Sequence, residues 1–311
     1  MLDVIMRRSL RWSLRPVTCP TGAGDGVEEG DAPAPGTAHR TRWRRVALLT
    51  LALGGAAAAA VIAGTLTAPR PAPSSPALPR IEVRRAAELP AVDLGFVTQR
   101  DHFMVTIGPG AGRGGELGDL LVVADATIAP RGGFPLHRHA GVDVVSIALD
   151  GTLTDEEPGQ STDVPAGGVL AIAAGAGIAH AETNRTDLPV RVLQLWFASA
   201  KPERAPAYQQ LAPGYQQGSD FLPLDLGVVR TDVQVRRGTL APGETTAWTV
   251  ARGHAAYVLC AGGQVELDDA HLDDGDGATL APGRFTVTAT GDAPARLVVI
   301  DVPAPGARVN R

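Results

Sequence analysis

From Ile81 onward, short runs of Val, Ile and Leu alternate with turns rich in Gly, Pro and Asp. Turns recur about every ten residues, a spacing typical of β-sandwiches and β-barrels. The chain has 37 Gly and 25 Pro among its 311 residues, which favours many short strands over long helices. The sequence therefore predicts an all-β fold, with strands at Leu120–Ile128, Val142–Ala148, Val169–Ala173, Val190–Phe197, Val229–Gly238, Ala256–Leu259, Gln264–Leu267, Phe285–Thr290 and Arg296–Val302.

The segment Val46–Thr67 contains no charged residue and is rich in Leu and Ala. An apolar stretch of about 20 residues can cross a bilayer as a helix. Arginines cluster just before the segment and only Arg70 follows closely, so the positive-inside rule places the N-terminus in the cytoplasm. The sequence thus predicts a single-pass protein of the cell membrane, with the remainder of the chain outside. Two alternatives are a cleaved export signal, which would give a secreted protein, and an Ala-rich segment that never inserts.

The segments that flank Val46–Thr67 differ in composition. Residues 1–45 are net basic, and residues 18–41 among them show no apolar period, so we expect a largely disordered cytoplasmic N-terminus. Residues 68–80 are rich in Pro and predict an extended spacer. Because the whole chain has a formal net charge of −5, the part after residue 45 is acidic. Nucleic acid is therefore not expected as a partner.

Two pairs of metal-binding residue types occur in the β-rich region, each with one residue between its members. His137 and His139 form the first pair, and His180 and Glu182 form the second. Residues i and i+2 of a strand point to the same face. Two neighbouring strands could thus direct three imidazoles and one carboxylate at a single ion. This set suits a divalent ion such as Fe(II), Mn or Zn and leaves coordination positions for water, O₂ or substrate.

The residues around both pairs resemble the two motifs of the pirin family. Residues 132–139, Gly-Gly-Phe-Pro-Leu-His-Arg-His, are similar to the first motif, and residues 174–182, which end in His-Ala-Glu, to the second. Residues 193–197, Leu-Gln-Leu-Trp-Phe, and the loop at 206–209 match as well. The resemblance implies a bicupin, two β-barrel domains in one chain. It also implies one iron site in the first barrel, with ligands that correspond to His137, His139, His180 and Glu182.

With this resemblance, the expected order is a transmembrane helix at 46–67, a metal-binding cupin at 81–205, a connection at 206–221 and a metal-free second cupin at 222–311. Iron(II) is the expected ion, with Mn, Zn, Cu and Ni as alternatives. The sequence departs from the family at Arg138, where Pro is usual, and at Asp143, where Glu is usual. We expect Asp143 at most to support the ligands.

Some pirins resemble quercetin dioxygenases, so the resemblance implies O₂-dependent cleavage of a small phenol similar to a flavonol. Glu182 would then bind the metal and also accept the phenolic proton. The alternative function is a non-enzymatic metal- or redox-sensing module that binds a protein partner, which the sequence does not identify. A purely structural bicupin is disfavoured because all four ligands are in place.

Other motifs carry a weaker signal. The loop Gly108–Gly115 is rich in Gly but lacks the Lys and the following helix of a phosphate-binding loop. His254 and His271 belong to no His-x-His or His-x-Glu pair, so neither is expected to bind a metal. His102 is expected to have a structural role.

Overall fold

The computed structural model describes residues 80–214, 216–217, 221, 223–229 and 231–304. The predicted all-β fold is confirmed for these residues, whose helical segments are the two short 3-10 helices η2 (Ala86–Glu88) and η3 (Gly108–Gly110). The predictions for the N-terminus at 1–45, the transmembrane helix at 46–67 and the spacer up to residue 79 lie outside the described residues. Within the described part of the chain, no helix has the length and apolar character needed to cross a bilayer.

The strands are short, in line with the frequent turns of the sequence. They are β1 (Ile81–Arg84), β2 (Ala91–Asp93), β3 (Val97–Asp101), β4 (Leu120–Ile128), β5 (Gly133–His139), β6 (Val142–Asp150), β7 (Thr152–Glu157), β8 (Gln160–Pro165), β9 (Val169–Ala173), β10 (Ile178–Thr183), β11 (Val190–Ala198), β12 (Ala207–Leu211), β13 (Gln216–Gln217), β14 (Gln234–Leu240), β15 (Thr245–Val250), β16 (His254–Cys260), β17 (Val265–Leu267), β18 (Ala270–Leu272), β19 (Gly277–Leu280), β20 (Gly283–Ala289) and β21 (Ala295–Pro303).

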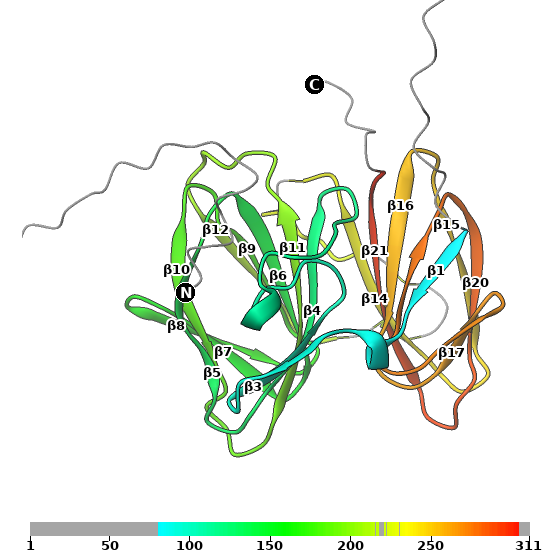
Figure 1. The fold of residues 1–311 in the computed structure, drawn as a ribbon, viewed down its shortest axis with the longest axis horizontal. Coiled ribbons are helices and arrows are strands. Elements are labelled where there is room, and N and C mark those ends of the chain that lie inside the picture. The colour runs from blue at the N-terminus through cyan, green and yellow to red at the C-terminus, as the bar shows by residue number, and fades with distance from the viewer. Residues whose placement is uncertain (1–79, 215, 218–220, 222, 230, 305–311) are drawn as a thin grey trace, which may run out of the picture. The chain divides into compact units, whose positions relative to one another are not determined.

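These strands form two pairs of sheets (Figure 1). In the first pair, a seven-stranded sheet with the order β12-β9-β6-β11-β4-β3-β2 packs on a four-stranded sheet with the order β5-β10-β7-β8. In the second pair, a six-stranded sheet with the order β1-β19-β16-β21-β14-β13 packs on a four-stranded sheet with the order β15-β20-β17-β18. Each pair encloses its own apolar core, and we call the two pairs the first and the second barrel.

Strand β11 shows how the sequence divides its side chains between two interiors. Val192 and Trp196 belong to the core inside the first barrel. Leu193, Leu195 and Phe197 belong to a different cluster, which also contains residues of the second barrel. This division follows from the alternation of side chains along a strand. Gln194 lies two residues from both Val192 and Trp196, so it also faces the interior of the first barrel.

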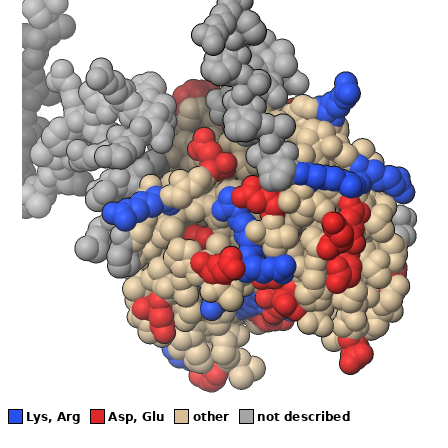
Figure 2. Space-filling view, turned by 45° about the vertical axis from the view of Figure 1, so that its right-hand side comes forward, with Lys and Arg blue, Asp and Glu red and all other residues tan. Residues whose placement is uncertain are grey.

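The cluster shared by the two barrels joins them through apolar burial. It takes fully buried side chains from β4, β6, β9 and β11 of the first barrel and from β14, β16 and β21 of the second. Ion pairs cross the same joint, at 2.9 Å between Arg191 and Asp274 and at 3.0 Å between Arg296 and Asp150. Figure 2 shows acidic and basic side chains interspersed on one face of the molecule. Apolar burial is the main stabilising contribution at such a joint.

Two short strands pair across the domain boundaries expected from the sequence. Strand β1 pairs with β19 of the second barrel, with Ile81 opposite Leu280, although it begins the segment expected to form the first cupin (Figure 1, cyan). Strand β12 lies inside the expected connection but pairs with β9 of the first barrel. The expected strand at Val229–Gly238 starts later, as β14, because a turn closed by the Val229 N–H and the Leu226 carbonyl precedes it.

Candidate metal centre

Strands β5 and β10 carry both metal-ligand pairs and run antiparallel, side by side. His180 lies opposite His137, and Ile178 lies opposite His139. The register shifts between His180 and Glu182, so that Glu182 lies opposite Phe134. The extra residue in β5 forms a β-bulge, a feature that often redirects side chains next to functional sites.

The structure brings His137, His139 and His180 together. One ligand nitrogen from each of the three lies within 4.8 Å of the others. Their ring centroids are 4.8 Å apart for His137 and His139, 4.5 Å for His137 and His180, and 5.0 Å for His139 and His180. His139 and His180 are buried, whereas His137 is half-buried. In the part of the chain that the structure describes, this is the one cluster of such residues arranged to hold a metal ion.

Hydrogen bonds orient two of the three rings. Nδ1 of His180 lies 2.6 Å from a carboxylate oxygen of Asp155, and Nδ1 of His137 lies 2.9 Å from the Pro135 carbonyl. In both cases the N–H donates, so Nε2 keeps its lone pair. The Nε2 atoms of His139 and His180 are buried and have no hydrogen-bond partner among the described residues. Buried polar atoms rarely lack a partner, so these atoms fit a bound metal ion.

The electrostatic surroundings differ among the three imidazoles. Burial, together with the two neighbouring histidines, lowers the pKa of His139 to about 2. Burial also lowers the pKa of His137, against the opposing charge of Glu182. Burial acts to lower the pKa of His180, but the hydrogen bond to Asp155 and the nearby carboxylate charges together outweigh it, so this pKa is raised. His137 and His139 are therefore neutral at physiological pH, the state that a metal ligand needs.

Glu182 lies on the inner face near the three histidines but is not part of their cluster. Its carboxylate is buried and accepts hydrogen bonds from Gln194 Nε2, at 2.9 and 2.7 Å to its two oxygens, and from Ser146 at 3.1 Å. The Oε1 atom of Gln194 in turn accepts a hydrogen bond from the Trp196 indole at 2.7 Å. The expected roles of Glu182 as a ligand and a proton acceptor stay predictions.

Asp143 is fully buried on β6, on the face opposite the histidines. Along β6, Val144 belongs to the core inside the first barrel, whereas Val145 belongs to the cluster shared by the two barrels. Alternation therefore turns Asp143 toward the second barrel.

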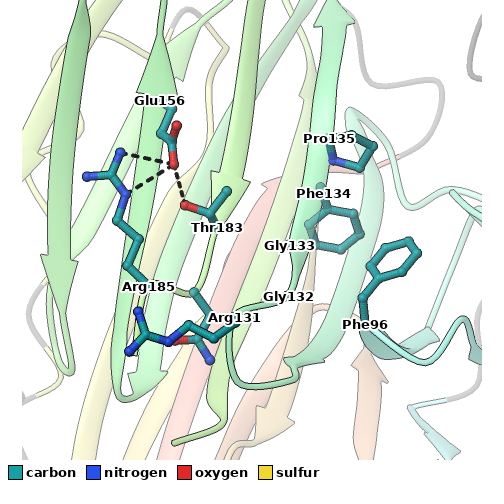
Figure 3. A pocket seen from close by; sticks show the side chains of 10 residues that line it. Phe96, Arg131, Gly132, Gly133, Phe134, Pro135, Glu156, Thr183 and Arg185 are labelled. Carbon is teal, nitrogen blue, oxygen red and sulfur yellow. Dashed lines mark hydrogen bonds and ion pairs between the residues drawn. The ribbon is translucent and has the colours of Figure 1, made fainter. Parts of the chain in front are cut away.

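A surface pocket of about 470 Å³ lies beside Phe134, and none of the three histidines lines it. Glu156, Thr183 and Arg185 form one side of it, joined by hydrogen bonds, and Phe96, Phe134 and Pro135 lie on the other side (Figure 3). Arg131, Gly132, Gly133 and Asn184 complete the lining. The ring of Phe134 lies 6.4 Å from that of His137, so this residue connects the pocket to the half-buried ligand.

The remaining histidines lie elsewhere. His102 is buried at the joint between the barrels, where its Nδ1 lies 2.6 Å from the Tyr257 hydroxyl. His254 pairs with Asp301 at 2.5 Å, and His271 contacts Glu266 and Asp273 on the surface of the second barrel. The loop Gly108–Gly115 contains the three-residue helix η3 and a turn back to Val105.

Sequence reasoning did not identify Asp155, Ser146, Gln194 and Trp196 as parts of the centre. Three of them come from strands β6 and β11, across the barrel from the histidines, and Asp155 comes from β7. Gln194 and Trp196 stand two residues apart in a strand that is otherwise apolar except for Arg191. Residues i and i+2 of a strand share one face, so two side chains with polar groups at this spacing in a buried strand could have indicated them.

Comparison with known proteins identifies the family. The family model described as Pirin matches residues 98–197, and the one described as Quercetinase C-terminal cupin domain matches residues 227–302. A pirin-like protein of Caulobacter vibrioides is 34% identical over 200 residues, which cover 59% of this chain and 83% of that protein. The chain belongs to the pirin family.

Other relatives of this pirin are more distant. A quercetin 2,3-dioxygenase of Escherichia coli is 23% identical over 59% of this chain and 82% of that protein. The crystal structure of YhhW from Escherichia coli has the same fold, with a TM-score of 0.65 and 22% identity over 72% of this chain and 98% of that one. A second structure of this bacterial pirin, in complex with nickel(II), gives a TM-score of 0.62.

Proposed function

We propose that this pirin is a metal-dependent dioxygenase that cleaves a small phenol, similar to a flavonol, with O₂. The observation that carries the proposal is the cluster of three imidazoles, two of which have buried Nε2 atoms without partners. The quercetin 2,3-dioxygenase from Escherichia coli supports the choice of reaction.

His137, His139 and His180 would hold the ion, and Glu182 would be the fourth ligand. Iron(II) is our proposed ion because it combines with nitrogen and oxygen ligands and reacts with O₂. The nickel(II) bound to the related bacterial pirin keeps Ni, with Mn, Zn and Cu, among the ions to be tested. When bound, the metal would lower the pKa of the phenolic hydroxyl and provide a place for O₂.

The protein's own residues would bind and orient the phenol. His137 is the half-buried ligand, so the substrate would approach from its side. The ring of Phe134 lies 6.4 Å from the His137 ring and would contact the rings of the phenol. The buried Glu182 carboxylate would accept the phenolic proton, and the apolar core of the barrel would exclude water.

Oxygen uptake by the purified full-length protein tests this function. The iron-loaded protein should consume O₂ with at least one member of a panel of flavonols and catechols, and His137→Ala should abolish both metal binding and uptake. His254→Ala, in the second barrel, is the control and should change neither. Metal binding without O₂ uptake on any phenol would refute the dioxygenase and leave the metal- or redox-sensing function.

We also propose that residues 46–67 tether this enzyme to the cell membrane, with the Pro-rich segment 68–80 as a spacer and the barrels outside. The apolar composition of 46–67 and the arginines before it support this topology. Full-length protein should stay in the membrane fraction after carbonate extraction. A mature N-terminus near residue 70 would instead show a cleaved signal and a secreted protein.

A further inference from the structure

We infer that Trp196 and Gln194 act as a positioning pair that holds the Glu182 carboxylate in place beside the three histidines. The inference deepens the proposed function and rests on metal binding at that centre. It concerns two residues of β11, neither of which is a candidate ligand.

The indole of Trp196 determines which way the Gln194 amide points. An indole N–H can only donate a hydrogen bond, so the atom 2.7 Å from it must be the amide oxygen of Gln194. The NH₂ group of Gln194 then has to point in the opposite direction, toward Glu182. Without the indole N–H, the amide could rotate and present its oxygen to the carboxylate.

The oriented amide acts directly on Glu182. Gln194 Nε2 lies 2.9 and 2.7 Å from the two carboxylate oxygens, and the Ser146 hydroxyl donates to one of them at 3.1 Å. An ionised carboxylate has only acceptors, so it is the partner that these donors require. Hydrogen bonds to a charged acceptor are short and strong, and together they fix the plane of the carboxylate.

Trp196 also touches a histidine of the centre. Its ring system lies 4.7 Å from the His139 ring at an interplanar angle of 83°, in an edge-to-face contact. Trp196, Gln194 and Glu182 are all at most 9% exposed, so water does not compete strongly for these contacts. One side chain thus packs on one ligand and, through Gln194, orients the predicted carboxylate ligand.

A double-mutant cycle with cobalt(II) as the probe tests this inference on the full-length protein. Trp196→Phe keeps an aromatic ring against His139 but removes the N–H. Gln194→Leu removes the amide that donates to Glu182 and leaves the Ser146 hydroxyl in place. Loss of groups that orient metal ligands typically lowers metal affinity about 10–100-fold. Each variant should therefore bind cobalt(II) about tenfold more weakly or worse in competition with a chelator, and the visible absorption of the bound ion should change.

The double variant distinguishes positioning from packing. If Trp196 acts through Gln194, the Trp196→Phe change should have little further effect in the Gln194→Leu background.

Trp248→Phe is the matched control, because the Trp248 N–H in the second barrel is buried and has no hydrogen-bond partner among the described residues. This variant should bind cobalt(II) as the wild type does.

Three results would overturn the inference: wild-type affinity and absorption in Trp196→Phe, additive losses in the double variant, or an equal loss in Trp248→Phe. If Gln194→Leu does not fold, Trp196→Phe and its control still decide the matter. A wild-type protein that takes up no cobalt(II) would instead refute the metal centre, and the inference with it. Cobalt uptake without O₂-dependent activity would refute only the proposed reaction.

Discussion

Replacing Asp155 by Asn should weaken metal binding about tenfold. The Asp155 carboxylate and His180 Nδ1 are 2.6 Å apart, and the two side chains are 2% and 0% exposed. A hydrogen bond to a charged group contributes about 1.5–3 kcal/mol, against about 0.5–1.5 kcal/mol for a neutral one. Asn keeps the shape and one acceptor oxygen, so the variant replaces a charged hydrogen bond by a neutral one. The stabilisation lost is the difference between the two, roughly 1–1.5 kcal/mol. About 1.4 kcal/mol corresponds to a factor of ten in affinity.

The second barrel provides a matched control for this change. His254 and Asp301 form a pair of the same chemistry at 2.5 Å, remote from the three-histidine cluster. Asp301→Asn should leave metal affinity at the wild-type value. Asp155→Ala should cost more than Asp155→Asn, up to about 100-fold, since the buried His180 N–H then loses its acceptor.

Competition between the protein and a fluorescent chelator, measured anaerobically with iron(II), gives the affinities of all four proteins. Circular dichroism of the metal-free variants establishes that each is folded. Our account of how His180 is oriented fails if Asp155→Asn binds iron within twofold of the wild type. It fails equally if Asp301→Asn loses as much affinity as Asp155→Asn.

Three further predictions address Glu182, the joint between the barrels and a close backbone approach. Glu182→Gln should lower the rate of O₂ uptake roughly 10²–10⁴-fold, the usual effect of losing a general base. It should lower the iron content less than His137→Ala does. Uptake at the wild-type rate would exclude Glu182 as the proton acceptor. Burial lowers the pKa of His102 to about 4 from its ordinary 6.5. Between these two pH values, the imidazole therefore binds a proton in the unfolded chain but not in the folded protein. The free energy of unfolding in urea, measured with chelator present, should therefore fall as the pH drops through this window. His102 should contribute up to about 1.4 kcal/mol of this fall per pH unit, and His102→Gln should remove that contribution. A Cβ at Gly277 would lie 2.0 Å from the Tyr257 hydroxyl, so Gly277→Ala should lower the free energy of unfolding by about 1–3 kcal/mol, whereas Gly115→Ala, which meets no atom within 4 Å, should not.

The sequence predicted the features that depend on local spacing. Leu120–Ile128 and Val169–Ala173 were predicted with the bounds that the structure shows, because each is a mainly apolar segment between turns. The pairs at His137 and at His180 could be recognised for a similar reason, since alternation along a strand makes residues i and i+2 neighbours on one face.

Features set by contacts between distant parts of the chain could not be predicted in the same way. Asp155 reaches His180 only because β7 pairs with β10, and nothing near His180 in the sequence indicates that register. Strand β1 has no alternation of buried and exposed residues strong enough to show which barrel it joins, and its partner lies almost 200 residues away. Strand pairing depends on side-chain contacts across the sheet and on burial, which a single segment does not reveal.

The two barrels share the order of their central strands but line their interiors with different chemistry. In the first barrel, β6 and β11 place Ser146 opposite Gln194, and both side chains act as donors to Glu182. In the second, the corresponding central strands β16 and β21 place Val258 opposite Val299 within a fully apolar part of the core. A buried carboxylate without hydrogen-bond donors is strongly unfavourable, so an interior lined by valines could not hold a residue like Glu182 in its ionised form. The polar pair on the sheet opposite the histidines is therefore as necessary for a carboxylate at this centre as the His-x-Glu spacing itself.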